Sequence, residues 1–148
     1  MLGGFEIMNY LPNFKDLINV ANIFCNNYSY EIKQHSNGVE SMGCAFINLE
    51  NKNFPKLIFE MERYILDFKV MYGKETISLL SIYKYLHPTE LLRNCISYRK
   101  KSNFRKYYIS DQIKYFDDFM KNKDSFNVND FHAFYEKYPL NVWKWIED

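Results

Sequence analysis

The chain has few of the residues from which recognisable catalytic and cofactor-binding motifs are built. It contains five glycines and no GxGxxG, GxxxxGKS, GxxxxGKT or GxSxG pattern, so it offers neither a phosphate-binding loop nor a nucleophile elbow. Its three histidines, His35, His87 and His132, are far apart in the sequence, and none belongs to an HxH, HExxH or HxxxH spacing that would indicate a metal site. We therefore predict that the protein is not an enzyme and uses no catalytic residue, metal ligand or cofactor.

Cysteine and long apolar runs are scarce as well. Cys25, Cys44 and Cys95 are an odd number, widely spaced and without a CxxC pair, so we expect buried thiols with a structural role. No stretch approaches the ~18 apolar residues of a membrane span, and the N-terminus lacks the cationic and apolar regions of a signal peptide. We therefore expect a cytoplasmic protein without a membrane partner, in which residues 1–8 form a poorly ordered extension.

Alanine is rare, whereas tyrosine and phenylalanine are abundant, with thirteen of each. This composition is typical of an AT-rich genome, whose codons favour Phe, Tyr, Asn, Lys and Ile, so the aromatic content by itself does not indicate a binding surface. The formal net charge is +1, which excludes a globally basic nucleic-acid coat and an acidic mimic of nucleic acid. A chain of 148 residues can form one domain with its own core, without a disulfide or a metal.

Apolar residues at three- and four-residue spacing predict helices along most of the chain. The first helix follows a capping residue, Asn13, and ends near Asn27. The clearest pattern runs from Asn53 to Gly73, with Pro55 in the first turn. Its apolar stripe comprises Phe54, Leu57, Ile58, Met61, Ile65, Phe68 and Tyr72. Further helices are expected over 74–86, 88–101, 110–122 and 127–138.

The periodicity changes to two after Tyr28, where apolar and polar residues alternate on both sides of an Asn-Gly pair. Asn-Gly between alternating runs is the strongest short-range signal for a β-hairpin. The predicted fold is therefore mostly α: a single-domain bundle of five or six helices, residues 1–148, with one small β-hairpin near residues 28–49.

The stretch "RNCISYRKKSNFRKYYISD", residues 93–111, concentrates positive charge. Six Lys or Arg residues and no Asp or Glu lie between residues 93 and 106. In one continuous helix these cations would be scattered around the whole circumference, so the sequence does not encode a recognition helix with a basic stripe. One interpretation is a helix that ends near Lys101, where cations favour the C-terminus. The other is a partner-binding surface, because Arg and Tyr anchor protein interfaces and also bind phosphates and bases. The candidate partner-binding residues are Arg99, Lys100, Lys101, Arg105, Lys106, Tyr107 and Tyr108.

No motif identifies a family. In its shortness, its lack of motifs and its aromatic content, the chain resembles toxin-neutralising immunity proteins and the counter-defence proteins of phages and plasmids. This resemblance covers no specific motif and assigns no residue a role. It implies a small non-catalytic binding protein, an inhibitor, immunity protein or antitoxin, that neutralises a protein partner stoichiometrically and needs only a complementary surface. The alternative is a nucleic-acid-binding module that uses the basic and aromatic segment 93–108, and an enzyme with an unrecognised site ranks third.

Overall fold

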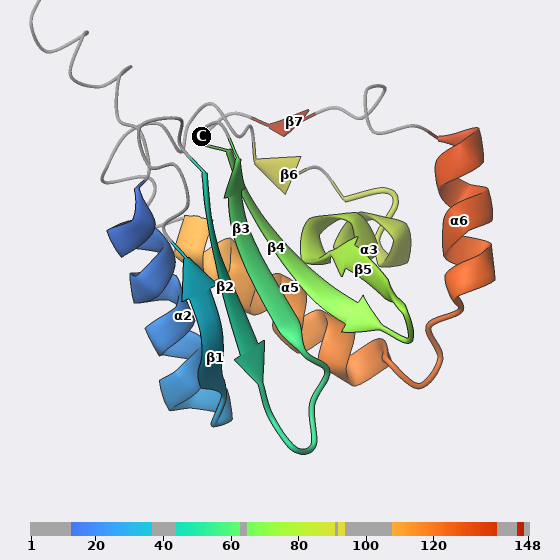
Figure 1. The fold of residues 1–148 in the computed structure, drawn as a ribbon. Helices are drawn as coiled ribbons and strands as arrows, with labels where there is room; N and C mark the ends of the chain where they lie inside the picture. Colours follow the sequence, from blue (N-terminus) through green and yellow to red (C-terminus); the bar gives the residue numbers. More distant parts are fainter. Residues whose placement is uncertain are drawn as a thin grey trace, which may run out of the picture. The chain divides into compact units, whose positions relative to one another are not determined.

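A computed structural model of the chain describes residues 13–36, 44–62, 65–90, 92–93, 108–138 and 145–146, to which every structural statement refers. These residues contain four α-helices and a five-stranded antiparallel sheet (Figure 1). The fold is therefore α+β, and the predicted mostly α bundle of five or six helices is wrong. The described residues up to Ser78 form one compact unit, the sheet unit, and those from Leu79 onward form a second, the C-terminal unit. This division does not test the prediction of a single domain.

The sheet unit begins with a helix and continues with five strands that pair in chain order. Its elements are α2 (Phe14–Tyr28), β1 (Glu31–Ser36), β2 (Ala45–Glu50), β3 (Leu57–Glu62), β4 (Ile65–Tyr72) and β5 (Glu75–Ser78). The predicted capping of the first helix is confirmed. The Asn13 side chain accepts a hydrogen bond from the Asp16 backbone N–H at 3.1 Å, and the Asp16 carboxylate accepts one from the Asn13 N–H at 3.0 Å. This capping box satisfies the Asn13 N–H and gives the Asp16 N–H a second acceptor beside the Asn13 carbonyl.

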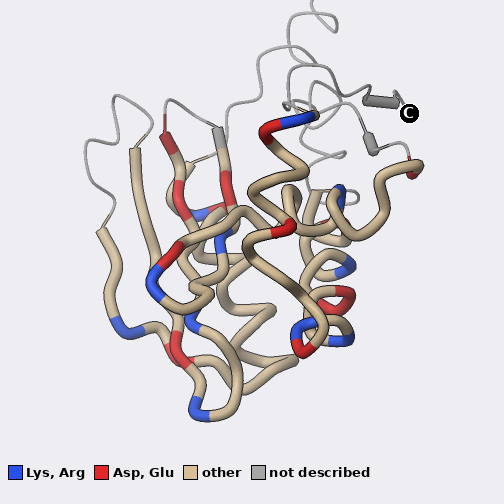
Figure 2. The backbone as a smooth tube through the Cα atoms, turned by 90° about the vertical axis from the view of Figure 1, so that its right-hand side faces the viewer, with Lys and Arg blue, Asp and Glu red and all other residues tan. Residues whose placement is uncertain are grey.

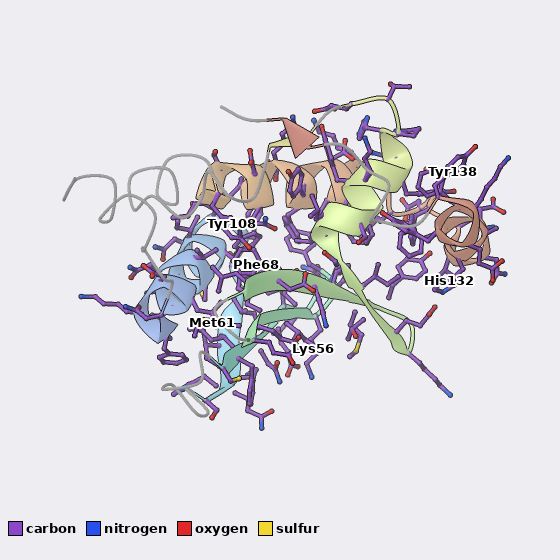
Figure 3. The ribbon with its side chains drawn as sticks, turned by 90° about the horizontal axis from the view of Figure 1, so that it is seen from above. Lys56, Met61, Phe68, Tyr108, His132 and Tyr138 are labelled. Atoms are coloured by element: carbon purple, nitrogen blue, oxygen red, sulfur yellow. The ribbon has the colours of Figure 1, made fainter. Side chains whose placement is uncertain are left out.

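The sheet face toward α2, the inner face, carries the core of this unit. One row of apolar residues crosses all five strands in register: Ile32, Leu49, Leu57, Val70 and Ile77. Helix α2 packs on this face, with the Phe24 ring centroid 5.1 Å from that of Phe59, which in turn lies 4.5 Å from that of Phe68. Figure 3 shows α2 on one side of the sheet and labels Phe68. Because side chains alternate between the two faces of a strand, every second residue enters this core.

The helix predicted over residues 53–73 is wrong, because this segment forms the β3–β4 hairpin. Its buried residues alternate in β3, but Ile58 on the opposite face completes a three-four pattern that also fits a helix. Pro55 begins no helix. Its carbonyl accepts a hydrogen bond from the Tyr30 hydroxyl at 2.6 Å. Gly73 has a φ of 65° and forms the tight turn between β4 and β5, where a glycine avoids the cost of the left-handed region.

The predicted β-hairpin near residues 28–49 is confirmed by the antiparallel pairing of β1 with β2. The register shifts between Ile32 and Gln34, where β1 contains a β-bulge. The turn predicted at the Asn-Gly pair lies outside the described residues, as does the extension predicted for residues 1–8.

The C-terminal unit contains three helices and one short pair of parallel strands. Its elements are α3 (Leu79–Leu86), β6 (Leu92–Arg93), α5 (Ile109–Asn122), α6 (Val128–Lys137) and β7 (Trp145–Ile146). Helices α5 and α6 confirm two predicted helices, and α6 has the expected cap, because the Asn127 side chain accepts from the Asp130 N–H at 3.0 Å. Only the second half of the helix predicted over 74–86 is helical, since residues 75–78 form β5. The described part of the helix predicted over 88–101 is not helical, because residues 88–90 form a turn and residues 92–93 form β6; the rest lies outside the described residues.

Helix α6 is attached to α3 through aromatic side chains. The Tyr85 ring makes edge-to-face contacts with Phe131 and Phe134, with centroid distances of 5.6 and 5.5 Å. The Tyr135 hydroxyl donates to the Ser81 carbonyl at 2.6 Å. Within the described parts of the chain, no helix combines the length and the apolar character needed to cross a lipid bilayer.

Replacing Phe68 by Ala should lower the free energy of unfolding by about 3–5 kcal/mol, because the lost ring leaves a cavity beside Phe59. Urea unfolding measures this change. The matched control is Thr76→Ala at an exposed position of β5, which should change the free energy by less than about 0.5 kcal/mol. A Phe68→Ala loss below about 1 kcal/mol would show that the inner face is misassigned.

Candidate functional site

Most of the partner-binding residues predicted from the sequence lie outside the described residues. These are Arg99, Lys100, Lys101, Arg105, Lys106 and Tyr107. Tyr108 is described and precedes α5, with helical backbone angles of φ −61° and ψ −49°. Helix α5 therefore begins at Ile109, one residue before the predicted start at Ser110. The role of the basic segment stays a prediction.

The described residues do not gather the three histidines into a metal site. His35 lies in β1 and His87 follows α3. His132 lies in α6 and is labelled in Figure 3. Among the described residues, no group of three or more His, Cys, Asp or Glu side chains is arranged to hold a metal ion. Burial, reinforced by the nearby Glu31 carboxylate, raises the pKa of the Cys25 thiol. A thiol with a raised pKa is a poor nucleophile. Cys25 and Cys44 are half-buried, not fully buried as predicted, and Cys95 lies outside the described residues.

The sheet face turned away from α2, the outer face, combines an apolar centre with polar surroundings. One of its rows crosses all five strands: Gln34, Asn48, Ile58, Lys69 and Ser78. A second row comprises Ser36, Phe46, Glu60 and Asp67. Phe46 and Ile58 are half-buried, and each is followed in its row by charged residues on β3 or β4. The outer face thus carries a half-buried apolar pair between polar side chains.

Two carboxylates face each other across the outer face. Glu60 and Asp67 are directly opposite in the β3–β4 register, an arrangement that is repulsive for like charges. Lys69 reduces this repulsion, because its Nζ lies 3.0 Å from Glu60 Oε2 and 3.9 Å from Asp67 Oδ2. Desolvation raises the pKa of Asp67 although the Ser78 hydroxyl and Lys69 act in the opposite direction. The hydrogen bond to Glu60 raises the pKa of Lys69. The two acids nevertheless remain 40% and 41% exposed, so a partner can reach them.

The negative charge of the outer face is concentrated near Phe46. We call Glu60, Glu62 and Asp67, with Phe46 and Ile58, the acidic patch. Among the described residues, the patch holds three carboxylates, and Lys69 pairs with two of them. Figure 2 marks the acidic positions along the strands in red and the basic positions in blue.

The charges balance at the other end of the outer face. There, the opposed pair Glu31 and Glu50 borders a hollow of about 480 Å³ to which Lys33 and Lys52 also contribute. Asn51 shapes this end of the sheet, because its side-chain Nδ2 donates to the Tyr28 and Ser29 carbonyls at 3.0 and 2.9 Å.

The C-terminal unit has its own cluster of titratable groups, but these groups satisfy one another. The Glu90 carboxylate accepts hydrogen bonds from the Tyr83 hydroxyl at 2.6 Å and from Lys114 Nζ at 2.9 Å. Lys84 Nζ donates to the Glu90 carbonyl. Tyr83, followed by Lys114, lowers the pKa of Glu90. Desolvation and then the hydrogen bond to Glu90 raise the pKa of Tyr83. This cluster fastens the loop after α3 to α5.

A second pair joins the end of α3 to α5. His87 Nε2 lies 2.8 Å from Asp118 Oδ1, and the His87 ring packs against that of Tyr83 at 4.6 Å. Asp118 Oδ2 is buried and has no hydrogen-bond partner among the described residues. A shallow hollow of about 450 Å³ lies beside this pair. Its lining is Tyr83, Ser110, Ile113, Lys114, Asp117, Asp118 and Lys121. The sequence carries no signal for the pairing of His87 with Asp118, which only the packing of α3 on α5 creates.

Neither a family model, nor a curated protein, nor a solved structure matches this chain. The functional argument therefore depends on the chain's own residues.

Replacing His87 by Ala should cost about 1–3 kcal/mol of unfolding free energy, because the buried Asp118 carboxylate loses its hydrogen-bond partner. The double variant His87→Ala, Asp118→Ala should be less destabilised than the two single losses added together, since no unpaired carboxylate then remains. Urea unfolding of the four proteins measures this coupling. Strictly additive losses would contradict a direct interaction.

Replacing Tyr83 by Phe should raise the pKa of Glu90 toward its ordinary value of 4.5, because the carboxylate loses the hydrogen bond that contributes most to lowering it. A folded-state pKa below the unfolded value contributes stability above that pH, and this stability is lost as the pH falls through the folded-state pKa. The unfolding free energy of the wild-type protein should therefore decrease more between pH 5 and pH 3 than that of Tyr83→Phe. Carboxyl-carbon NMR titration measures the pKa, and an unchanged Glu90 value would contradict the assignment.

Proposed function

We propose that this chain is a non-catalytic binding protein that neutralises a partner protein by occupying its surface, in the manner of an immunity protein or antitoxin. The observation that supports the proposal is the outer face, where Phe46 and Ile58 lie half-exposed between polar side chains. Binding energy at protein interfaces is concentrated in such apolar anchors, and the polar frame around them excludes water and sets the orientation.

The rigidity of this surface supports the proposal further. Its residues are held in register by pairing along five strands, so binding orders no loop and costs little conformational entropy. The charged groups of the C-terminal cluster, although Lys114 and Glu90 are 56% and 39% exposed, are engaged in hydrogen bonds that fasten the loop after α3 to α5. The proposal keeps the cytoplasmic location expected from the sequence.

The alternative function, nucleic-acid binding through residues 93–108, stays a prediction. If all six cations of this segment contact phosphates of duplex DNA, the logarithm of the affinity should fall against the logarithm of salt concentration with a slope of about −5. Electrophoretic mobility shifts with random duplex DNA at two salt concentrations test this alternative separately from the sheet. The acidic patch of the outer face would repel a phosphate backbone, so the sheet itself is not the expected surface for it.

A titration against the partner tests the proposed function. The partner is first isolated by affinity capture with the full chain and then titrated while its own activity is measured. An occupancy mechanism predicts that the effect is complete at a fixed molar ratio. Phe46→Ala should weaken the binding at an unchanged stoichiometry. The control is Thr76→Ala, which also lies on the sheet but outside the acidic patch, and it should behave as the wild type. Saturation far below one equivalent of the chain would show turnover and contradict the proposal.

A further inference from the structure

The outer face places two acidic residues directly opposite each other, a feature that the proposed function alone does not require. Its two acids Glu60 and Asp67 are direct neighbours across β3 and β4, although opposite charges would stabilise the sheet at such positions. A solvated face needs no such pair. Local choices that oppose stability are expected where a surface serves a function.

Lys69 is the counter-ion of the two acids, but its Nζ lies closer to one carboxylate than to the other. Its Nζ is within hydrogen-bond distance of Glu60 at 3.0 Å, whereas Asp67 is 3.9 Å away. With Glu62 on the same face, the described residues of the patch hold three carboxylates, two of which share Lys69. The carboxylates are exposed by about two fifths, so a second cation can approach them from solvent.

The apolar part of the acidic patch lies directly beside these charges. Phe46 is the register partner of Glu60, and Ile58 is that of Lys69. An occupant that fits both features carries a cationic group next to an apolar one. A guanidinium suits this position, because it can bind carboxylates with two parallel hydrogen bonds and also stack on an aromatic ring.

We infer that the acidic patch docks a basic and apolar surface of a protein partner, in which an arginine binds Glu60 and Asp67 while apolar side chains cover Phe46 and Ile58. This inference rests on the proposed function and names the chemistry of the partner. Lys69 competes with the incoming arginine for the same carboxylates. Removing the lysine therefore strengthens binding, and removing the acids weakens it.

The test uses the full chain with three synthetic strand-forming peptides: one alternating arginine with leucine, one with glutamate in place of arginine, and one with serine there. Backbone and side-chain NMR shifts locate the binding, and calorimetry at two salt concentrations measures it. The expected result is binding of the arginine peptide alone, with shifts at Phe46, Ile58, Glu60 and Asp67 and weaker affinity at the higher salt.

Two variants should change this affinity in opposite directions. Glu60→Gln with Asp67→Asn should weaken it about tenfold or more, the equivalent of about 1.4 kcal/mol. Because this double variant removes a repulsion, it should remain folded. Lys69→Met should strengthen the affinity. The matched control is Asp124→Asn with Glu136→Gln, which removes the same charge from exposed positions of the C-terminal unit and should leave the affinity unchanged.

Each other outcome overturns the inference in a distinct way. Binding of the glutamate or serine peptide to Phe46 and Ile58 as tightly as the arginine peptide would overturn the cationic occupant and leave the docking function standing. Arginine-peptide shifts away from the outer face, equal losses in the control variant, or a weaker affinity of Lys69→Met would overturn the site itself. Failure of the proposed function appears separately, as turnover in the partner titration.

Discussion

The register of the five-stranded sheet is the constraint on which the rest of the sheet unit depends. Because side chains alternate along each strand, a shift of one residue in any pairing would exchange the two faces. The observed register aligns apolar residues from all five strands on the inner face, where they meet α2. The same register then fixes which polar residues become neighbours on the outer face. Core and candidate surface are thus two results of one set of backbone hydrogen bonds.

Burial on the inner face also supplies the rigidity that the outer face needs. Phe59 contacts Phe24 of α2 on one side and Phe68 of the next strand on the other, so the strands that carry Glu60 and Asp67 are held from behind. The repulsion between these two acids is small compared with the burial of such rings, since exposed charge pairs contribute about 0–1 kcal/mol and a buried phenylalanine contributes several times that. The sheet can therefore keep an unfavourable pair at its surface without losing its fold.

Local signals explain which parts of this structure were predictable from the sequence. Helix starts were predictable because a capping side chain bonds a backbone N–H only three residues further along the chain. Asn13 caps α2 in this way through Asp16, and Asn127 caps α6 through Asp130. The hairpin at 28–49 was predictable from an equally local signal, the Asn-Gly pair between two runs of alternating apolar and polar residues. The segment from Asn53 to Gly73 was not, because Ile58 on the outer face makes the apolar spacing compatible with both periods. Reading it as a helix removed β3 and β4, and reading residues 74–86 as a helix removed β5, so the predicted fold class was wrong.

The candidate surface was beyond sequence reasoning for a different reason. Its neighbours come from separate strands, whereas the sequence prediction placed Glu60 and Asp67 in one helix because the pairing of β3 with β4 was not foreseen. His87 and Asp118, 31 positions apart, likewise meet only through packing. The basic segment, residues 93–108, lies almost wholly outside the described residues. Its role is therefore tested by the mobility shifts and not by the structure.

The central claim is that a protein partner binds the outer face of the sheet. Hydroxyl-radical footprinting of the chain, alone and with a saturating amount of its purified partner, tests this claim most directly, because phenylalanine side chains are oxidised only where solvent reaches them. The account predicts that oxidation of Phe46 decreases strongly on binding while that of Tyr138, which is 44% exposed in the C-terminal unit, is unchanged. Unchanged oxidation of Phe46, together with protection elsewhere in the chain, would contradict it.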